Sequence, residues 1–337
     1  MKRRTFVGGL VLLGSAALGC DKKSGPTGAG SAGGGGRLRI AVIPKGTTHE
    51  FWKAVHAGAV KAAKELDVDV VWKGPLKEDD LKSQVDLVQS FTAQGVSGIV
   101  LAPLNDKALI SSVKGATRAK IPVVIFDSAL AGGETVSFVA TDNRAAGRLA
   151  GERMAKLLGS DGKVVLLRYQ EGSASTFERE EGFLEGIKKT PSIQIVSDNQ
   201  YGGATTESAF SASESLLLAK GADKGDVGGV FCPNESTTFG MLLALQKAKL
   251  TGKVRFIGFD ASDKLVEGVK SGQIDALVLQ DPLGMGYTAV KTLVTHVRGT
   301  KVEARIDTGA SLVDKANMAE PKIAGLLRPE IEKWLGK

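Results

Sequence analysis

The stretch SFVATDNRAAGRLAGERMAKLLG, residues 137–159, contains a change of structure that organises the whole chain. It begins as a weak strand, passes through the helix-capping residues Asp142 and Asn143, and follows a helical pattern over residues 143–158. Gly159 is typical of a helix end. Spacings of three and four predict the buried face of this helix: Ala146, Leu149, Ala150, Met154 and Leu157. The junction predicts where one lobe ends and the next begins.

Apolar runs of strand length lie on both sides of this junction, separated by amphipathic stretches. They are rich in Val and Ile, as parallel strands covered on both faces need to be. The runs are LRIAVI (38–43), VDVVW (68–72), SGIVLA (97–102), IPVVIF (121–126), KVVLLR (163–168), IQIVS (193–197), VGGVF (227–231), VRFIGF (254–259) and IDALVL (274–279). Strands alternating with helices predict an α/β fold of parallel sheets flanked by helices. There are too many strands for one small sheet, which indicates two lobes.

The first twenty residues differ from the rest of the 337-residue chain, which has ordinary globular composition. MKRR is followed by the uncharged stretch TFVGGLVLLGSAALG and by Cys20, a pattern typical of a secretory signal. ALGC resembles a lipobox, with Ala17 where Leu is usual, and predicts lipidation of Cys20. RRTFV resembles a twin-arginine export signal. Arg3 and Arg4 are explained equally well as the positively charged first region of an ordinary secretory signal. Residues 21–36 are small or polar and predict a flexible tether.

The charge distribution argues against nucleic acid as a partner. The formal net charge is +7, and removing Lys2, Arg3 and Arg4 leaves 7 − 3 = +4 for the mature chain. Basic and acidic residues are interspersed, without the basic stripe and interleaved aromatics that nucleic acid requires. Cys232 has no partner once Cys20 is lipidated, and it is expected to be a small buried apolar residue.

Polar and aromatic residues follow many of the expected strands. PKGTTHEFW, residues 44–52, follows the first run, and YQEGSASTFER, residues 169–179, follows the fifth. Other runs end at Asp127, Asn234, Asp260 or Gln280. Each position alone is explained by a polar loop or a helix cap. Taken together in two lobes, they predict a ligand cleft at the carboxyl ends of the strands.

Several motifs between residues 38 and about 310 resemble the sugar-binding proteins of bacterial ABC importers, of the ribose-binding, periplasmic-binding-protein type I kind. They are HEFWKAVHAGA (49–59), VVIFDSA (123–129), VATDNRAAGRLAGERMA (139–155), FEREEGF (177–183), GGVFCPNESTTFGMLLAL (228–245), FIGFDAS (256–262) and LVLQDPLGMG (277–286). The resemblance implies a monomer whose two lobes close on a sugar and present it to a membrane permease, with neither cofactor nor metal. Lipidation would anchor it in the cell envelope, in the periplasm or on the outer face of the cytoplasmic membrane.

The resemblance also implies three chain crossings between the lobes, near residues 140–142, 280–282 and 308–311. The first lobe would then comprise residues 37–140 and 281–309, and the second lobe residues 141–280 and 310–337.

Carried over position by position, the resemblance implies a set of sugar-binding residues. Phe51 and Trp52 would stack on the ring, Asp127, Asn234 and Asp260 would accept or share hydroxyl hydrogen bonds, Arg179 and Gln280 would donate, and Tyr201 would be a further aromatic. His49 stands where ribose-type proteins have Asn, and Ser128 where they have Arg. Since Ser cannot replace a guanidinium fork, another pentose, a hexose, a polyol or a non-sugar solute stays open.

Three other functions are alternatives to solute import. An enzyme is disfavoured because the G-x-S-x-G, H-E-x-x-H and C-x-x-C patterns are missing, and GMGYTA (284–289) lacks the βαβ unit of a dinucleotide site. A sugar-responsive repressor would need a DNA-binding helix-turn-helix where the leader and tether stand. A binding protein that feeds a membrane sensor or chemoreceptor stays open.

The expected helix after residue 50 separates the two aromatic neighbours. Phe51 lies on the same face of the helix as Val55, Ala59, Ala62 and Leu66, so it can be explained as a core residue. Trp52 lies about 100° round the helix, off that stripe, because each residue of an α-helix turns by that angle. We therefore expect Trp52 to face the ligand and Phe51 to be shared between core and cleft.

Overall fold

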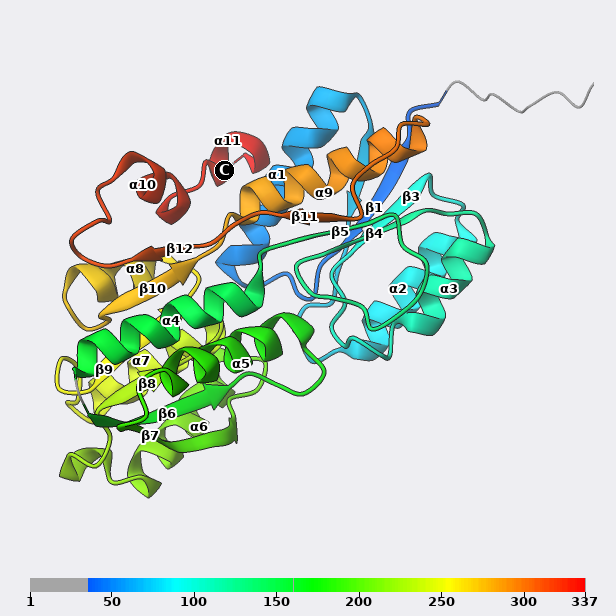
Figure 1. The fold of residues 1–337 in the computed structure, drawn as a ribbon. Helices are drawn as coiled ribbons and strands as arrows, with labels where there is room; N and C mark the ends of the chain where they lie inside the picture. The colour runs from blue at the N-terminus through cyan, green and yellow to red at the C-terminus, as the bar shows by residue number, and fades with distance from the viewer. Residues whose placement is uncertain (1–35, 160, 337) are drawn as a thin grey trace, which may run out of the picture. The chain divides into compact units, whose positions relative to one another are not determined.

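The computed structural model describes residues 36–159 and 161–336, and the predicted signal, Cys20 and most of the tether lie outside them. Within the described part, the strands form two six-stranded sheets (Figure 1). The first sheet has the order β11-β5-β4-β3-β1-β2, with all neighbours parallel. Its strands are β1 (Arg39–Ile43), β2 (Asp69–Trp72), β3 (Gly98–Leu101), β4 (Val123–Phe126), β5 (Ser137–Ala140) and β11 (Arg305–Asp307).

The second sheet has the order β12-β10-β9-β8-β6-β7. Its strands are β6 (Gly162–Arg168), β7 (Ile193–Tyr201), β8 (Gly229–Phe231), β9 (Arg255–Phe259), β10 (Ala276–Leu279) and β12 (Ser311–Val313). Neighbours are parallel except β12, which runs antiparallel to β10. Every apolar run expected to be a strand forms one, and the α/β fold class is confirmed. The short edge strands β11 and β12 were not expected.

Helices cover both faces of each sheet. We define the first lobe as the first sheet with four helices. They are α1 (Glu50–Leu66), α2 (Leu81–Ala93), α3 (Ile110–Arg118) and α9 (Pro282–Val297). We define the second lobe as the second sheet with six helices. They are α4 (Asn143–Leu158), α5 (Ala174–Lys188), α6 (Thr206–Ala219), α7 (Glu235–Lys247), α8 (Asp263–Lys270) and α10 (Pro321–Leu327). A 3₁₀ turn (Ala222–Lys224) and α11 (Ile331–Leu335) complete the described elements.

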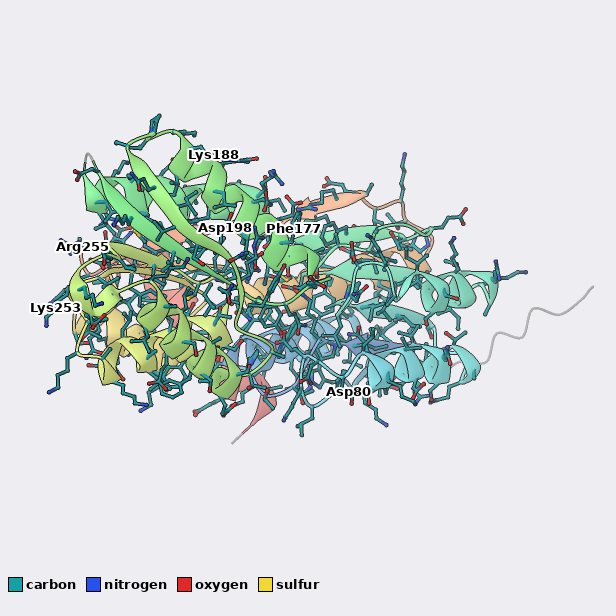
Figure 2. All side chains as sticks on the ribbon, turned by 90° about the horizontal axis from the view of Figure 1, so that it is seen from below. Asp80, Phe177, Lys188, Asp198, Lys253 and Arg255 are labelled. Atoms are coloured by element: carbon teal, nitrogen blue, oxygen red, sulfur yellow. The ribbon has the colours of Figure 1, made fainter. Side chains whose placement is uncertain are left out.

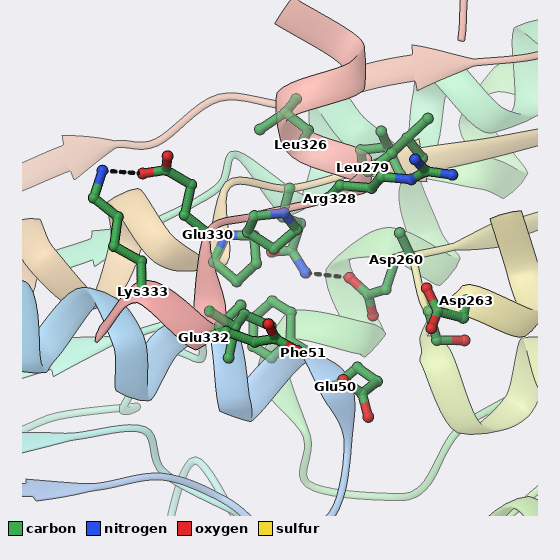
Figure 3. Close-up of a pocket in the computed structure, with 18 residues that line it drawn as sticks. Glu50, Phe51, Asp260, Asp263, Leu279, Leu326, Arg328, Glu330, Glu332 and Lys333 are labelled. Atoms are coloured by element: carbon green, nitrogen blue, oxygen red, sulfur yellow. Dashed lines mark hydrogen bonds and ion pairs between the residues drawn. The ribbon is translucent and has the colours of Figure 1, made fainter. Parts of the chain in front are cut away.

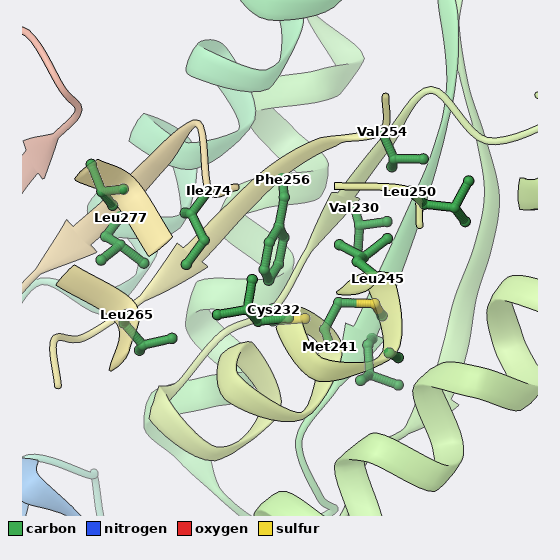
Figure 4. Packing of buried hydrophobic residues seen from close by; sticks show 14 of the residues in the cluster. Val230, Cys232, Met241, Leu245, Leu250, Val254, Phe256, Leu265, Ile274 and Leu277 are labelled. Atoms are coloured by element: carbon green, nitrogen blue, oxygen red, sulfur yellow. The ribbon is translucent and has the colours of Figure 1, made fainter. Parts of the chain in front are cut away.

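The two faces of each sheet have separate apolar cores, as strands buried on both sides require. In the first lobe, α1 and α9 cover one core, and α2 and α3 cover the other. In the second lobe, α4 and α5 cover one face, and α6, α7 and α8 cover the opposite face. Figure 4 shows part of this last core, where Cys232 lies among Phe256, Met241 and Leu265. The prediction that Cys232 is a buried apolar residue is confirmed.

The junction at residues 137–159 has the predicted structure, with one exception on its buried face. β5 ends at Ala140, the Asp142 side chain accepts a hydrogen bond from the Ala145 N–H, and α4 spans Asn143–Leu158. Gly159 follows as the C-cap. Leu149 was expected to be buried, and this is wrong, because 39% of it is exposed. Glycines 147 and 151 occupy the buried face of α4 beside Ala146, Ala150 and Met154.

These glycines allow α4 and α5 to touch backbone to backbone. A Cβ atom on Gly147 would lie 2.0 Å from the carbonyl oxygen of Arg179, and one on Gly182 would lie 2.1 Å from that of Arg144. In the first lobe, Gly58 and Gly286 play the same part between α1 and α9, with clashes at 1.9 and 2.1 Å. No side chain fits at such distances, so each lobe needs glycine to hold its helix pair in place.

The chain passes between the two sheets three times within the described residues: after β5, after β10 and between β11 and β12. Beyond the third passage, α10 buries Ile323 and Leu327 in the core of the second lobe. The predicted division assigns α11 to the second lobe as well. Its Trp334 ring nevertheless lies against the first lobe, 5.8 Å from the Lys61 ammonium and 5.5 Å from that of Lys64, both on α1. No helix of the described residues is long and apolar enough to cross a membrane.

Candidate ligand cleft

A small cavity lies where the carboxyl ends of strands from both sheets meet. The first lobe lines it with residues that follow β1 and β4 and with the loop before α2. The second lobe lines it with residues that follow β6, β8, β9 and β10. The lining comprises Lys45, His49, Phe51, Trp52, Glu78, Asp127, Tyr169, Ser175, Thr176, Arg179, Asn234, Glu235, Asp260 and Gln280. This is the position in an open parallel sheet where ligands bind.

The structure brings most of the predicted site residues together at this cavity. His49, Phe51, Trp52, Asp127, Arg179, Asn234, Asp260 and Gln280 all line it. Ser128 does not, because its side chain is fully buried behind the lining, where its Oγ accepts a hydrogen bond from the Ser175 N–H at 3.1 Å. Tyr201 lies outside the cavity at the end of β7 and is 45% exposed.

The aromatic wall of the cavity is more deeply buried than the helical pattern predicts. The expectation that Trp52 lies off the buried face of α1 is wrong, since only 2% of it is exposed. Its ring makes edge-to-face contacts with Phe51 at 4.9 Å and Phe126 at 6.1 Å between centroids. Trp52 is therefore both core and cavity wall. The helical pattern does not show this burial, because the sheet covers one face of α1 and the loop that carries Glu78 covers the adjacent face, where Trp52 lies.

Glu78 is the centre of the polar network in the first lobe. One carboxylate oxygen, Oε1, accepts hydrogen bonds from Trp52 Nε1 at 2.6 Å and from His49 Nδ1 at 2.7 Å. The other, Oε2, accepts from the Tyr169 hydroxyl at 2.7 Å. Burial opposes charge on His49, but the charge and hydrogen bond of Glu78 outweigh it and raise the pKa of His49 to about 9. Burial likewise opposes charge on Glu78, yet His49, Lys45 and Trp52 lower the pKa of Glu78 to about 2.

Two buried cations neighbour the Asp127 carboxylate. Lys45 Nζ lies 3.5 Å from Asp127 and also donates to Ser173 Oγ at 3.1 Å and Ser175 Oγ at 3.0 Å. An Arg179 nitrogen lies 3.9 Å from the same carboxylate. Lys45 and Asp127 belong to the first lobe, and Ser173, Ser175 and Arg179 belong to the second. The hydrogen bonds of Lys45 to the two serines and the Arg179–Asp127 pair therefore cross between the lobes. They also keep Asp127 from being an uncompensated buried charge.

Arg179 is held by two hydrogen bonds and a ring contact, and its Nη2 makes only the long ion pair with Asp127 at 3.9 Å. Its Nε donates to Asn143 Oδ1 at 2.8 Å, its Nη1 donates to the Pro233 carbonyl at 3.0 Å, and its plane lies 4.0 Å from the centroid of the Phe259 ring. Its buried Nη2 has no hydrogen-bond partner among the described residues. A donor is therefore fixed at the cavity without an acceptor.

Asp260 and Gln280 form the opposite part of the second-lobe wall. Gln280 Nε2 donates to Asp260 Oδ1 at 2.7 Å, and the Glu235 N–H donates to Asp260 Oδ2 at 3.1 Å. Burial raises the pKa of Asp260, against the opposing effect of Arg179. Gln280 Oε1 is a buried acceptor without a partner in the described structure. Asn234 also lines this wall while it caps α7 through the Thr237 N–H.

The two aspartates at the strand ends share an uncommon backbone conformation. Asp127 after β4 has φ of 58°, and Asp260 after β9 has φ of 67°. Residues other than glycine adopt this left-handed region at a cost, and Asp does so more readily than most. Each lobe thus turns one carboxylate into the cavity by the same backbone device.

Several cavity residues were not singled out from the sequence: Lys45, Glu78, Tyr169, Ser175, Thr176 and Glu235. Most belong to stretches expected at strand ends, where nothing distinguishes them from their polar neighbours. Thr176 lines the cavity while Phe177, the next residue of α5, is exposed (Figure 2). Glu78 lies in the charged run KEDD, which carries no signal that one acid is buried.

The cavity is small, about 30 Å³, whereas a larger one of about 620 Å³ lies behind it at the second chain crossing. The larger cavity is bounded by α1, the residues after β9 and β10, and the segment from Leu326 to Lys333 (Figure 3). Phe51, Asp260 and Gln280 line both cavities and form the wall between them. In the described chain no cluster of three or more His, Cys, Asp or Glu residues could hold a metal ion.

Known proteins share both the sequence and the fold of this chain. The ribose import binding protein of Haemophilus influenzae is 31% identical over 276 residues, which cover 82% of this chain and 91% of that protein. The carbohydrate transporter solute-binding protein of Agrobacterium radiobacter, solved with D-arabinose, is 36% identical with a TM-score of 0.82 over 87% of this chain and 99% of its own. An ABC transporter solute-binding protein of Agrobacterium vitis, solved with D-fucose, is 36% identical with a TM-score of 0.82 over 86% of this chain and 100% of its own.

The periplasmic binding protein domain matches residues 40–301, which include most of both sheets and every residue that lines the small cavity. The chain therefore belongs to the periplasmic binding protein family, whose members are solute-binding proteins and not enzymes.

Proposed function

We propose that this protein is the extracytoplasmic solute-binding lipoprotein of an ABC import system and that it binds a monosaccharide or related polyol in the small cavity. The observation that carries the proposal is the pair of unsatisfied groups there, the Arg179 Nη2 donor and the Gln280 Oε1 acceptor. A sugar hydroxyl both accepts and donates, so one hydroxyl or two neighbouring hydroxyls would satisfy both groups.

The rest of the lining suits a sugar ring. Such a ring has an apolar C–H face and a polar rim, and here the Phe51 and Trp52 rings lie beside Asp127, Asp260 and Arg179. A buried polar group left without a partner costs about 1–3 kcal/mol, so the positions of these groups would select among epimers. The relatives, which include ribose, allose, arabinose and fucose binders, support the monosaccharide class.

Entry of such a solute requires the lobes to separate. A cavity of about 30 Å³ has room for only one or two water molecules, and a monosaccharide needs several times that space. The lobes touch directly across the cavity through Lys45, Glu78 and Glu235. Binding would therefore shift the population between an open form and a closed form.

Delivery and anchoring follow from the same proposal. Cys20, outside the described residues, would carry the lipid that tethers the protein in the periplasm or on the outer face of the cytoplasmic membrane. A permease would recognise the closed form, because only in that form do the two lobes have a fixed position relative to each other. We propose the monosaccharide class and not ribose in particular, since His49 lines the cavity and Ser128 is withdrawn from it.

A binding panel tests the ligand class. Purified protein is titrated with D-ribose, D-arabinose, D-fucose, D-allose and xylitol, with amino acids as the contrast set, by calorimetry and thermal shift. A ligand that binds the folded state raises the unfolding midpoint. We expect one or more sugars or polyols to bind and the amino acids not to bind. If an amino acid binds and every sugar and polyol fails, the monosaccharide proposal is wrong.

A further inference from the structure

We propose that Glu78 is a positioning residue that holds the aromatic wall of the cavity in place and latches the two lobes together through Tyr169. The proposal deepens the function proposed above and rests on it for the identity of the solute. The latch itself belongs to the protein alone and can be tested without a solute.

The latch joins segments of different lobes. Glu78 lies in the loop between β2 and α2 of the first lobe, and Tyr169 follows β6 of the second lobe. Their side chains meet at 2.7 Å, with the phenol donating to Oε2. The next residue, Gln170, donates through Nε2 to the Glu78 main-chain carbonyl at 2.8 Å. Two consecutive residues of the second lobe therefore hold the same residue of the first.

The same carboxylate fixes two residues of its own lobe. Its Oε1 accepts from Trp52 Nε1 and from His49 Nδ1. The indole nitrogen has a single hydrogen to donate, so Glu78 takes up all of the polar capacity of the Trp52 ring. A carboxylate has about four lone-pair sites, and three donors from two segments, the start of α1 and the loop after β6, occupy most of them here. Glu78 therefore has little capacity left for a solute, which is why we assign it positioning rather than direct binding.

The surroundings of Glu78 are built for a fixed charge. The residue is 6% exposed, and His49 Nδ1 lies 2.7 Å from its carboxylate, where the imidazole balances the charge when it is protonated. Gly46 approaches so closely that a Cβ atom there would lie 2.8 Å from Glu78 Cγ. A side chain at position 46 would force the Glu78 stem to move. Charge balance and close packing together restrict the carboxylate to one place.

Opening and closing affect these bonds differently. The bonds from Tyr169 and Gln170 cross between the lobes beside a cavity too small for a sugar, so they must break when the lobes separate to admit one. The bonds from Trp52 and His49 stay within the first lobe and need not break. Glu78 would thus keep the aromatic wall ordered in the open form and gain its third donor on closing. Such preorganisation lowers the ordering cost of binding.

Tyr169→Phe tests the latch, because it removes only the hydroxyl that crosses between the lobes. Spin labels at the exposed positions Lys114→Cys on α3 and Lys188→Cys on α5 report the distance between the lobes. In the protein without solute, we expect Tyr169→Phe to shift the distance distribution toward larger separations. Tyr287→Phe on α9, away from the cavity lining, is the matched control and should leave it unchanged. An unchanged distribution for Tyr169→Phe overturns the latch.

Kinetics with a sugar give a second measurement. We expect Tyr169→Phe to raise the dissociation rate of D-arabinose about tenfold or more, because a hydrogen bond to a charged group is lost, while the association rate changes little. A loss confined to the association rate contradicts the latch. If the parent binds no sugar at all, the proposed solute class fails, and the distance measurement still decides the latch.

Glu78→Gln tests the positioning role. The amide keeps the shape but cannot accept from all three donors, so we expect the fluorescence of Trp52 to change without any solute. Trp52→Phe in both backgrounds isolates its contribution from those of the other tryptophans. An unchanged Trp52 spectrum overturns the positioning role, and Tyr169→Phe keeps the latch testable if Glu78→Gln does not fold.

Discussion

The charge on His49 is stabilised against burial mainly by Glu78, with smaller contributions from Glu235 and Asp260, and this makes the stability of the protein depend on pH in a defined way. The pKa of His49 is raised to about 9, so its contribution is complete below its unfolded value of 6.5 and is lost as pH rises through 9. The pKa of Glu78 is lowered to about 2, so its contribution is complete above 4.5 and is lost as pH falls through 2. We expect this pair to stabilise the fold most between about pH 4.5 and 6.5.

Histidine titration by NMR checks this expectation. In the parent protein, the His49 ring should titrate near pH 9, and in Glu78→Gln the pKa should fall, because the charge and hydrogen bond that raise it are removed. His56 is the internal reference, since its pKa is lowered by burial and should not respond. A His49 pKa that is the same in both proteins would contradict the assignment.

Arg179 supports a second expectation at the scale of single residues. Arg179→Lys keeps the charge but cannot donate to Asn143 and Pro233 at once while stacking on Phe259. A hydrogen bond from a charged group contributes about 1.5–3 kcal/mol, so sugar affinity should fall at least tenfold by calorimetry. Arg148→Lys, a part-exposed residue of α4 that pairs with Glu185, is the control and should retain affinity. Equal losses in both variants would show a general effect of the substitution.

Single residues were the hardest scale to predict. Asp127, Asp260 and Gln280 were found at the cavity because each follows an apolar strand, a local signal that fixes their place at the sheet edge. Trp52 was misjudged, since the helical pattern of α1 cannot show that a distant loop covers its other side. Glu78 was not found at all. Its burial depends on contacts with Tyr169, 91 positions away in the sequence, which no local pattern encodes.

At the scale of elements, the glycine contact between α4 and α5 allows a matched comparison. Gly147→Ala places a methyl group 2.0 Å from a main-chain oxygen, and such overpacking costs about 1–3 kcal/mol. Gly115→Ala in α3 meets nothing within 4 Å and should gain about 0.5–1 kcal/mol from helix propensity. Unfolding by urea measures both changes. A Gly147→Ala protein as stable as the parent would show that the helices can separate at no cost.

Elements with strong local signals were predicted closely, and those without were missed. The bounds of α4 agree to the residue because a capping aspartate, an apolar stripe and a terminal glycine all lie in one stretch. β11 and β12 are three residues long each and pair at sheet edges with strands far away in sequence. Their sequences, RID and SLV, are too short to carry a period. Leu149 was assigned to the core because the pattern counts large apolar residues and overlooks glycine.

At the scale of the whole molecule, closure of the lobes should depend on protons through Glu235. The side chain of His49, the N-cap of α1, makes no capping bond, and Glu235 of the opposite lobe instead accepts from the Glu50 N–H at 3.2 Å and the Phe51 N–H at 3.0 Å. Burial raises the pKa of Glu235 to about 7, with His49 and these N–H groups opposing the rise. In an open form, solvent would return the pKa toward 4.5, so closing takes up a proton between these values.

We therefore expect sugar affinity to weaken as pH rises from about 4.5 to 7, because ionised Glu235 must lose its solvation on closing. Calorimetry at several pH values, in two buffers of different ionisation enthalpy, measures the affinity and the proton uptake together. Glu235→Gln removes the titrating group and should flatten the dependence over this range. A slope that persists in Glu235→Gln would assign the proton to another group, of which His49 and Asp260 are the nearest.

The two-lobed architecture itself was predictable, since apolar strands, their alternation with helices and the junction at residues 137–159 are all local features. Their arrangement around a cavity was implied by resemblance to a family. The direct contacts between the lobes were not foreseen, because Lys45, Glu78 and Glu235 lie in polar loops and meet their partners only after both lobes have formed.

The three passages of the chain between the sheets have a consequence for the order in which the protein can fold. A chain synthesised only as far as Asp281 already contains α1 but not α9, whose Met285, Ala289 and Leu293 complete the core beside it. It also lacks β11 and β12, the outer strands of both sheets. Neither lobe can therefore complete its folding before the last segment has been synthesised. The first lobe is synthesised first, so the delay before its core is complete is longest there. The protein should therefore reach its native state only after the segment beyond Asp281 has been synthesised.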